Sequence, residues 1–207
     1  VDLSMSGLSE DVLVECKFAH DRIQQAAYFL IPQADRPKVH WRLGQSLLRH
    51  PSVEKQSHHL FAIVNHLNAG KDSRCHHTER NELVTLNLQA GRKAKATAAY
   101  EPAFKYLQVG VSLLPDNAWN QQYEIALALH IETAEAAYLS GDFQQMEHLT
   151  TLVLRQAQTV LDKVQAYEVI LHACSAQNNV TQGVQVGLQV LDLLGEQLPH
   201  DPSQADI

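Results

Sequence analysis

Apolar residues recur along the chain with the spacing of a helix face. Near the start, Ile23, Ala26, Ala27 and Leu30 occupy positions i, i+3, i+4 and i+7, which predicts a helix with one apolar stripe. Pro32 ends this helix, because proline lacks the backbone N–H that the next turn needs. The same periodicity predicts further helices at about 35–49, 56–69, 79–97, 101–114, 119–140, 143–157, 160–177 and 181–194.

The first 70 residues contain three further features: an inner helix face, a helix end and a possible strand. Val39, Leu43 and Leu47 align on one side of the second predicted helix and form its expected inner face. Gly70 directly follows the third predicted helix and is expected to cap its C-terminus. Residues 12–18, VLVECKF, alternate apolar and polar positions, which predicts a short strand.

The helices from residue 79 onward are joined by short connections, which force neighbouring helices to pack antiparallel. Ala103, Met146 and Gly183 stand at equivalent places in successive helix pairs, 43 and 37 residues apart. These intervals exceed the usual tetratricopeptide period of about 34 residues, so longer helices are expected.

One of these pairs follows the tetratricopeptide pattern closely. Gly91, Tyr100, Ala103, Leu107 and Pro115 have its spacing, and small residues at such positions let two helices approach. The predicted fold is therefore all-α, a tetratricopeptide-like superhelix of antiparallel helix pairs with a possible N-terminal strand. A generic helical bundle is the alternative.

Composition agrees with a helical protein of the cytoplasm. Hydrophobic residues make up 45% of the chain, with only nine glycines and seven prolines among 207 residues. The three cysteines are odd in number and far apart, which favours a reducing compartment over a disulfide framework. No apolar run approaches the roughly 18 residues of a membrane span. The start at Val1, without a signal peptide, suggests a fragment of a longer chain.

Charge is distributed unevenly. The net charge is −7, yet residues 1–118 carry 14 basic and 12 acidic side chains, whereas residues 119–207 carry 2 and 11. An acidic second half argues against a nucleic-acid partner, because phosphate binding needs clustered Lys and Arg. Arg36, Lys38, Arg42 and Arg49 could contact DNA phosphates, but a solvated helix face or contact with an acidic partner domain is the simpler interpretation.

His20 and Asp21 form a His-Asp pair like that of some metal-dependent phosphohydrolases. Such sites need further His and Asp ligands, and none recurs here at a suitable spacing. Asp21 is better explained as a first-turn residue whose negative charge faces the positive end of the helix dipole. The expected roles of this pair are to start the helix and to pack.

Other candidate chemistry is equally weak. Cys75, His76 and His77, with the pair at 58–59, lack the paired ligand spacing of structural zinc sites. The segment GRKAKAT at 91–97 lacks the spacing of a phosphate-binding loop, and no GxSxG motif accompanies a nucleophile. We therefore expect no catalytic residue, no bound metal and no cofactor, and the chain is predicted not to be an enzyme.

Several stretches together resemble a known family. CKFAHDRIQQAAYFLIPQADRPKVHWRLGQSLL at 16–48, LFAIVNHLNAG at 60–70 and AEAAYLSGDF at 134–143 are similar to the region that follows the ATPase core in large bacterial multi-domain sensor kinases. The resemblance covers roughly residues 12–198. It implies an AAA-type ATPase and Ser/Thr- and histidine-kinase domains elsewhere in such proteins, and it carries no catalytic residue into this chain.

The resemblance also implies a domain organisation. Residues 1–50 would be the tail of a winged-helix-like segment, 56–198 the helical repeat array and 199–207 a frayed tail. The implied function is a non-catalytic protein-interaction or regulatory module of a signalling kinase. Binding of a small molecule within the superhelix is the alternative, and contact with DNA through the winged-helix segment is a weaker one. No membrane partner is expected.

Partner-binding residues follow from the repeat register. Ligands of such arrays often lie on the concave face, which the first helix of each pair builds. This register selects Arg92, Lys95, Glu135 and Tyr138 as the candidate partner-binding residues. Two cations in this set favour an acidic or C-terminal carboxylate group on a bound protein or peptide.

Overall fold

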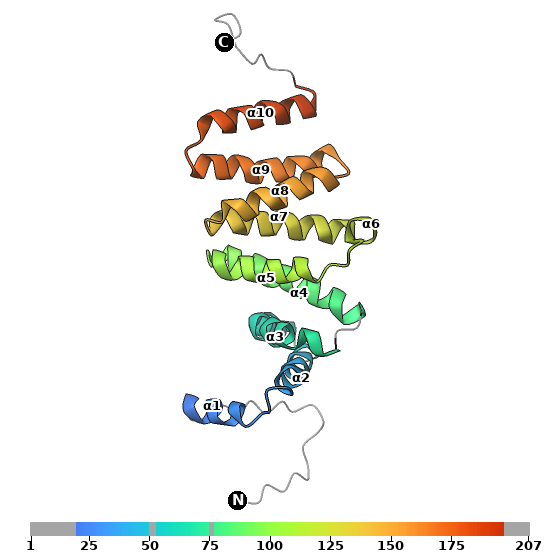
Figure 1. Ribbon diagram of the computed structural model, residues 1–207, viewed down its shortest axis with the longest axis vertical. Coiled ribbons are helices and arrows are strands. Elements are labelled where there is room, and N and C mark those ends of the chain that lie inside the picture. The colour runs from blue at the N-terminus through green and yellow to red at the C-terminus, as the bar shows by residue number, and fades with distance from the viewer. Residues whose placement is uncertain (1–19, 50–52, 75–76, 197–207) are drawn as a thin grey trace, which may run out of the picture.

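A computed structural model describes residues 20–49, 53–74 and 77–196. These residues form ten α-helices and no strand, which confirms the all-α prediction (Figure 1). The strand predicted at 12–18 lies outside the described residues. The helices are α1 Asp21–Phe29, α2 Arg36–Leu48, α3 Val53–Arg74, α4 His77–Ala96, α5 Tyr100–Ser112, α6 Ala118–Gln121, α7 Tyr123–Leu139, α8 Phe143–Gln156, α9 Val160–Ala176 and α10 Val180–Leu194.

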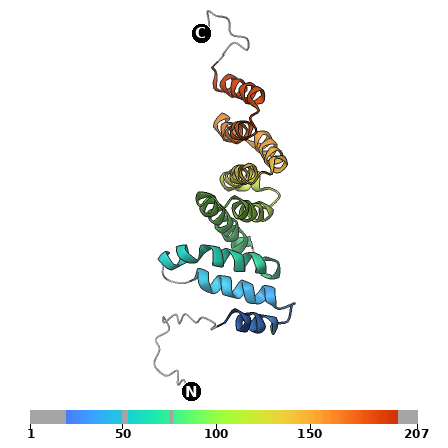
Figure 2. The ribbon, with the colours of Figure 1, turned by 90° about the vertical axis from the view of Figure 1, so that its left-hand side faces the viewer.

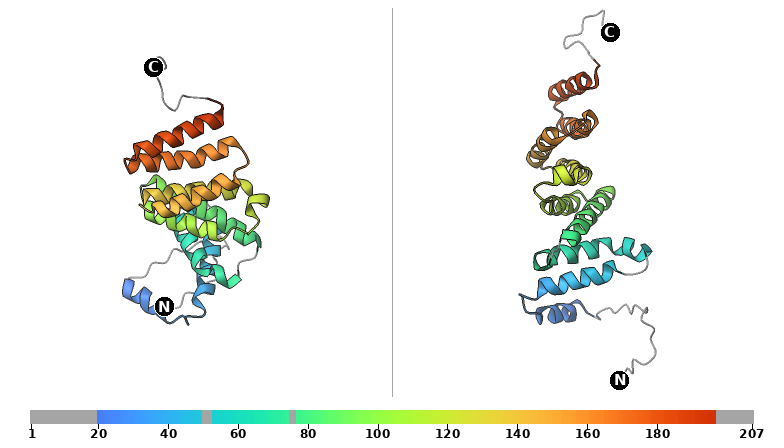
Figure 3. Two further views of the ribbon diagram at one scale, coloured as in Figure 1. Left: turned by 45° about the horizontal axis from the view of Figure 1, so that its top comes forward. Right: turned by 90° about the vertical axis from the view of Figure 1, so that its right-hand side faces the viewer.

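The helices stack into an elongated array of pairs. α2 packs against α3, α4 against α5, α7 against α8, and α9 against α10, and each pair then contacts the next along the stack. α1 and α10 consequently lie at opposite ends of the array (Figures 1, 2 and 3). None of the described helices is long and apolar enough to cross a membrane.

The core is continuous in the first half of the stack and divided in the second. One buried cluster runs from Trp41 in α2 through α3, α4 and α5 to Leu129 and Ala136 in α7. Two smaller clusters, around Leu149 and Val153, join α7, α8 and α9. α1 and α10 contain no fully buried residue, so the terminal helices are held by fewer apolar contacts than the central ones.

The same turn joins the two helices of three successive pairs. Ala98, Gly141 and Asn178 adopt the left-handed backbone conformation, with φ of 59°, 87° and 57°. In each turn the next residue donates its N–H to the carbonyl five residues earlier, the outer bond of a Schellman motif. These bonds are Ala99 N to Ala94 O at 3.0 Å, Asp142 N to Ala137 O at 2.8 Å and Asn179 N to Cys174 O at 2.8 Å.

The turn residues Ala98, Gly141 and Asn178 are 43 and 37 residues apart, which are the intervals expected from sequence. The difference between these two intervals does not come from a difference in helix length. α7 and α9 both contain 17 residues. The first interval instead includes the extra helix α6, and Gln122, with φ −137° and ψ 45°, separates α6 from α7. The single helix predicted at 119–140 was therefore wrong, because hydrophobic periodicity continues across this break.

Gly70 does not cap a helix as predicted, because it lies inside α3. A β-carbon built at Gly70 would come within 2.6 Å of both Pro37 O and Trp41 N, two backbone atoms of α2. Gly44 of α2 is similarly close to Leu67 of α3, with a β-carbon 2.6 Å from the Leu67 side chain. Glycine at these positions lets α2 and α3 cross at short range.

This close crossing also changes which face of α2 is buried. Trp41 and Gly44 are buried against α3, whereas the predicted inner residue Leu43 is 46% exposed. The stripe predicted on α1 is exposed as well, with Ile23 at 53% and Leu30 at 84%. Apolar side chains of α1 and α2 are thereby left at the surface.

Candidate functional site

The four residues predicted to bind a partner lie at the contact between α4 and α7. Arg92 and Lys95 are on α4, and Glu135 and Tyr138 are on α7. The Lys95 ammonium forms an ion pair with the Glu135 carboxylate. The structure therefore brings members of this set into direct contact, although they are 40 residues apart in sequence.

Glu132 completes this cluster and was not among the predicted residues. Its carboxylate accepts a hydrogen bond from Arg92 Nε at 2.7 Å and another from Lys95 Nζ at 2.6 Å. Two cations and two carboxylates therefore balance within the cluster. The sequence does contain a signal for it, since Arg92 and Lys95 have the same i, i+3 spacing as Glu132 and Glu135.

Burial and ion pairing act in opposite directions in this cluster. Desolvation by itself disfavours the charged forms, but hydrogen bonds to Glu132 and Glu135 outweigh it and raise the pKa of Lys95. In the same way desolvation is outweighed by hydrogen bonds from Lys95 and Arg92, so the pKa of Glu132 is lowered. Lys95 and Glu132 therefore stay charged at neutral pH, and a carboxylate ligand would compete with Glu132 for the cations.

Tyr138 extends the same surface from α7 to α9. Its ring lies 6.4 Å from the ring of His172, centroid to centroid. Burial, with a smaller contribution from Glu135, raises the pKa of the Tyr138 phenol, which keeps its proton at neutral pH. We call the surface formed by Arg92, Lys95, Glu132, Glu135 and Tyr138 the α4–α7 face.

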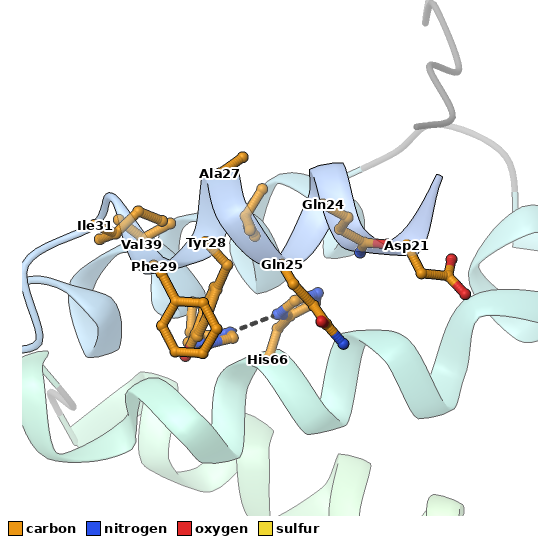
Figure 4. A pocket seen from close by; sticks show the side chains of 11 residues that line it. Asp21, Gln24, Gln25, Ala27, Tyr28, Phe29, Ile31, Val39 and His66 are labelled. Atoms are coloured by element: carbon orange, nitrogen blue, oxygen red, sulfur yellow. Dashed lines mark hydrogen bonds between the residues drawn. The ribbon is translucent and has the colours of Figure 1, made fainter. Parts of the chain in front are cut away.

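A cavity of about 890 Å³ lies near the N-terminal end of the described array, between α1, α2 and α3. Figure 4 shows side chains of α1 over a floor formed by the other two helices. Most of the lining is apolar or aromatic. The lining residues are Asp21, Gln24, Gln25, Ala27, Tyr28, Phe29, Ile31, Val39, His40, Leu43 and His66.

A chain of hydrogen bonds crosses the floor of this cavity. The Tyr28 hydroxyl lies 3.2 Å from His40 Nε2, and His40 Nδ1 lies 2.8 Å from His66 Nδ1 (Figure 4). The Nδ1 to Nδ1 contact requires one ring to donate and the other to accept, so the two imidazoles cannot both be protonated. Desolvation, followed by the proximity of His40, lowers the pKa of His66.

Arg36 fixes the turn between α1 and α2 beside the cavity. Its Nε donates to Ile31 O at 3.2 Å, and its guanidinium lies 4.6 Å from the Tyr28 ring centroid and 5.4 Å from that of Phe29. A cation over an aromatic face is attracted by the ring quadrupole. Arg36 therefore makes its contacts within the chain. Lys38 forms an ion pair with Asp35, with an Nζ to Oδ1 distance of 3.3 Å.

His20 and Asp21 have the positions predicted for a helix start. His20 is the N-cap residue, with an extended backbone, and Asp21 lies in the first turn of α1. No described group of three or more His, Cys, Asp or Glu side chains has the arrangement of a metal site. The zinc candidates Cys75 and His76 lie outside the described residues.

The chain is similar in sequence to a curated signalling kinase. The chain is 27% identical over 176 residues to the hybrid signal transduction histidine kinase G of Dictyostelium discoideum. The match covers 73% of this chain and 5% of the kinase, so the chain corresponds to a small part of that protein. No family model matches the chain, and no solved structure matches it significantly. Most of this helical array is therefore related to a region of a signal-transduction kinase.

Proposed function

We propose that this chain is a non-catalytic regulatory module of a multi-domain signalling kinase, and that it acts by binding a protein or peptide. The observation that carries the proposal is the relationship of an elongated helical array to a region of a signalling kinase. In this proposal the array is tetratricopeptide-like, and phosphotransfer belongs to other domains of a cytoplasmic protein. The partner is another domain of the same kinase or a separate signalling protein.

The α4–α7 face is the proposed contact surface. It presents exposed Arg92 beside a half-buried network of Lys95, Glu132 and Glu135, with Tyr138 next to them. Because Arg92 and Lys95 are already paired, a carboxylate of the partner would have to replace Glu132 or Glu135 as the ion-pair partner of these cations. Such exchange gives specificity more readily than affinity, since wrong partners leave charges unpaired.

DNA binding is the less favoured function. The basic residues that suggested it lie on and near α2, where Arg36 is stacked on aromatic rings and Lys38 is paired with Asp35. A chain of net charge −7 also lacks the overall positive field that attracts nucleic acid.

The proposal is tested by cross-linking the chain within the intact kinase and identifying the joined peptides by mass spectrometry. The captured domain or protein is then titrated against three forms of the chain. These are the wild type, a double variant with Arg92→Glu and Lys95→Glu, and a quadruple variant that adds Glu132→Lys and Glu135→Lys. The quadruple variant restores the internal ion pairs with the signs exchanged, so it separates loss of recognition from loss of structure.

We expect both variants to lose binding at least tenfold if the face recognises charge. Wild-type affinity in the quadruple variant, with loss in the double variant alone, would mean that the network is only structural. Equal affinity of all three forms would remove the face as a contact surface.

A further inference from the structure

We propose that the cavity between α1, α2 and α3 is a binding site for a small, uncharged and mostly apolar molecule with one hydrogen-bonding group. The proposal does not depend on protein binding by the α4–α7 face, which lies on other helices. It follows from the size, the lining and the charge balance of the cavity.

The size and the lining suit an organic ligand. A volume of about 890 Å³ falls within the roughly 300–1,000 Å³ that is typical of ligand pockets. Ala27, Ile31, Val39 and Leu43 provide aliphatic wall, and Phe29 adds an aromatic ring. Leu43 and Phe29 remain 46% and 70% exposed, so a ligand seated here would remove apolar surface from water.

The hydrogen-bond chain on the floor is incomplete at its ends. Whichever tautomers occur, the series from Tyr28 through His40 to His66 uses one donor and one acceptor at each internal contact. One end of the series then offers a donor and the other end an acceptor. In Figure 4 the second nitrogen of His66 lies on the side of the ring away from the dashed hydrogen bond. A single polar group on an apolar ligand can be recognised at this position.

The charges around the cavity favour a neutral ligand. Asp21 lies at one end of the cavity, near Gln24 (Figure 4), and the Arg36 guanidinium lies against the rings of Tyr28 and Phe29. An anion would be repelled by the Asp21 carboxylate, and the mostly apolar lining disfavours the desolvation of any charged group. The lowered pKa of His66 favours the neutral form of its imidazole at neutral pH, so a neutral molecule enters without bringing an unbalanced charge.

The test uses the fluorescent probe N-phenyl-1-naphthylamine, which is neutral, alongside the anionic probe 1-anilinonaphthalene-8-sulfonate. Both are titrated into the 207-residue chain at pH 7.5. We expect saturable binding of the neutral probe at one site per chain and at least tenfold weaker binding of the anionic probe. Stronger binding of the anionic probe would overturn the proposal.

Two matched variants locate the site. Leu43→Glu places a charge in the cavity at a residue that is already partly exposed. Val184→Glu is the control: it places a charge at an exposed apolar residue of α10, far from the cavity, where Val184 is 56% exposed. We expect Leu43→Glu to weaken the neutral probe at least tenfold and Val184→Glu to leave it unchanged. Equal effects of the two variants, or none from Leu43→Glu, would show adsorption to exposed apolar surface and overturn the proposal. Circular dichroism is used to check that both variants remain helical.

A competition experiment tests the hydrogen-bonding part. We expect 1-naphthol to displace the neutral probe about 3–10 times more effectively than naphthalene, as one net hydrogen bond allows. His66→Phe keeps an aromatic ring but removes the polar nitrogen, and in this variant the two competitors should become equal. A preference for 1-naphthol that survives His66→Phe would exclude His66 as the recognition element.

Discussion

The substitution Gly70→Ala tests the close crossing of α2 and α3 directly. The new β-carbon would lie 2.6 Å from Pro37 O and from Trp41 N, whereas ordinary contact begins at 3.4 Å. Backbone atoms cannot rotate away as the end of a side chain can, so α2 must move by about 0.8 Å. A gap of that size forfeits a quarter to a half of the dispersion energy of each contact that it opens.

The expected loss of stability combines two opposing effects. Overpacking of a tight interface costs about 1–3 kcal/mol. Replacing glycine by alanine inside a helix returns about 0.5–1 kcal/mol, because the unfolded chain is less disordered. For Gly70→Ala these ranges combine to a net decrease of about 1 kcal/mol, and at most about 2.5 kcal/mol, in the free energy of unfolding.

Gly187→Ala in α10 is the matched control. A β-carbon at Gly187 has no heavy atom within 4 Å, so only the helix-propensity effect operates and stability should rise by about 0.5–1 kcal/mol. Urea unfolding is followed by circular dichroism for the whole array and by tryptophan fluorescence, since Trp41 lies at the α2–α3 contact. If Gly70→Ala raised the unfolding midpoint as Gly187→Ala does, the close crossing would be refuted.

Three further substitutions follow from the structure. Ala98→Gly should stabilise the chain by about 0.5–1 kcal/mol, because glycine tolerates the left-handed conformation that alanine adopts only at a cost; an unchanged melting temperature would contradict the turn geometry. Glu132→Gln should destabilise it by about 1–2 kcal/mol in thermal unfolding, because Lys95 loses a charged hydrogen-bond partner in a half-buried position. Burial lowers the pKa of His130 and of His66, so the unfolded chain binds protons that the folded chain excludes as pH falls below 6.5. Stability should therefore decrease from pH 7 to pH 5.5, and His130→Phe should remove part of that decrease in urea titrations at each pH.

Sequence periodicity predicted most of the helices, but it missed the break between α6 and α7 and did not show which faces of α1 and α2 are buried. Helix formation depends on local spacing, which Ile23 and Leu30 satisfy. Burial depends on what lies opposite, and these two side chains have no partner helix over them among the described residues. Gly70 illustrates the same limit, because a glycine at a helix end and a glycine at a helix crossing look alike in sequence.

The candidate sites were predictable to different degrees. The α4–α7 face follows from repeat register, and the complementary spacing of charges on α4 and α7 could also have identified Glu132. The cavity could not have been found this way, because His40 and His66 lie 26 residues apart without a shared motif. Their contact depends on the glycine-mediated crossing of α2 and α3, which no local pattern encodes.

The repeated turn and the variable connection have different consequences for engineering. Lengthening the turn at Gly141 would break both hydrogen bonds of the Schellman motif and shift the register of α7 against α8. The connection before α6 already holds extra residues relative to the next repeat, and Asp116 within it is exposed. An epitope tag or a fluorescent reporter inserted after Asp116 would therefore leave the helix pairs intact. Such an internal tag would allow the protein to be followed in living cells.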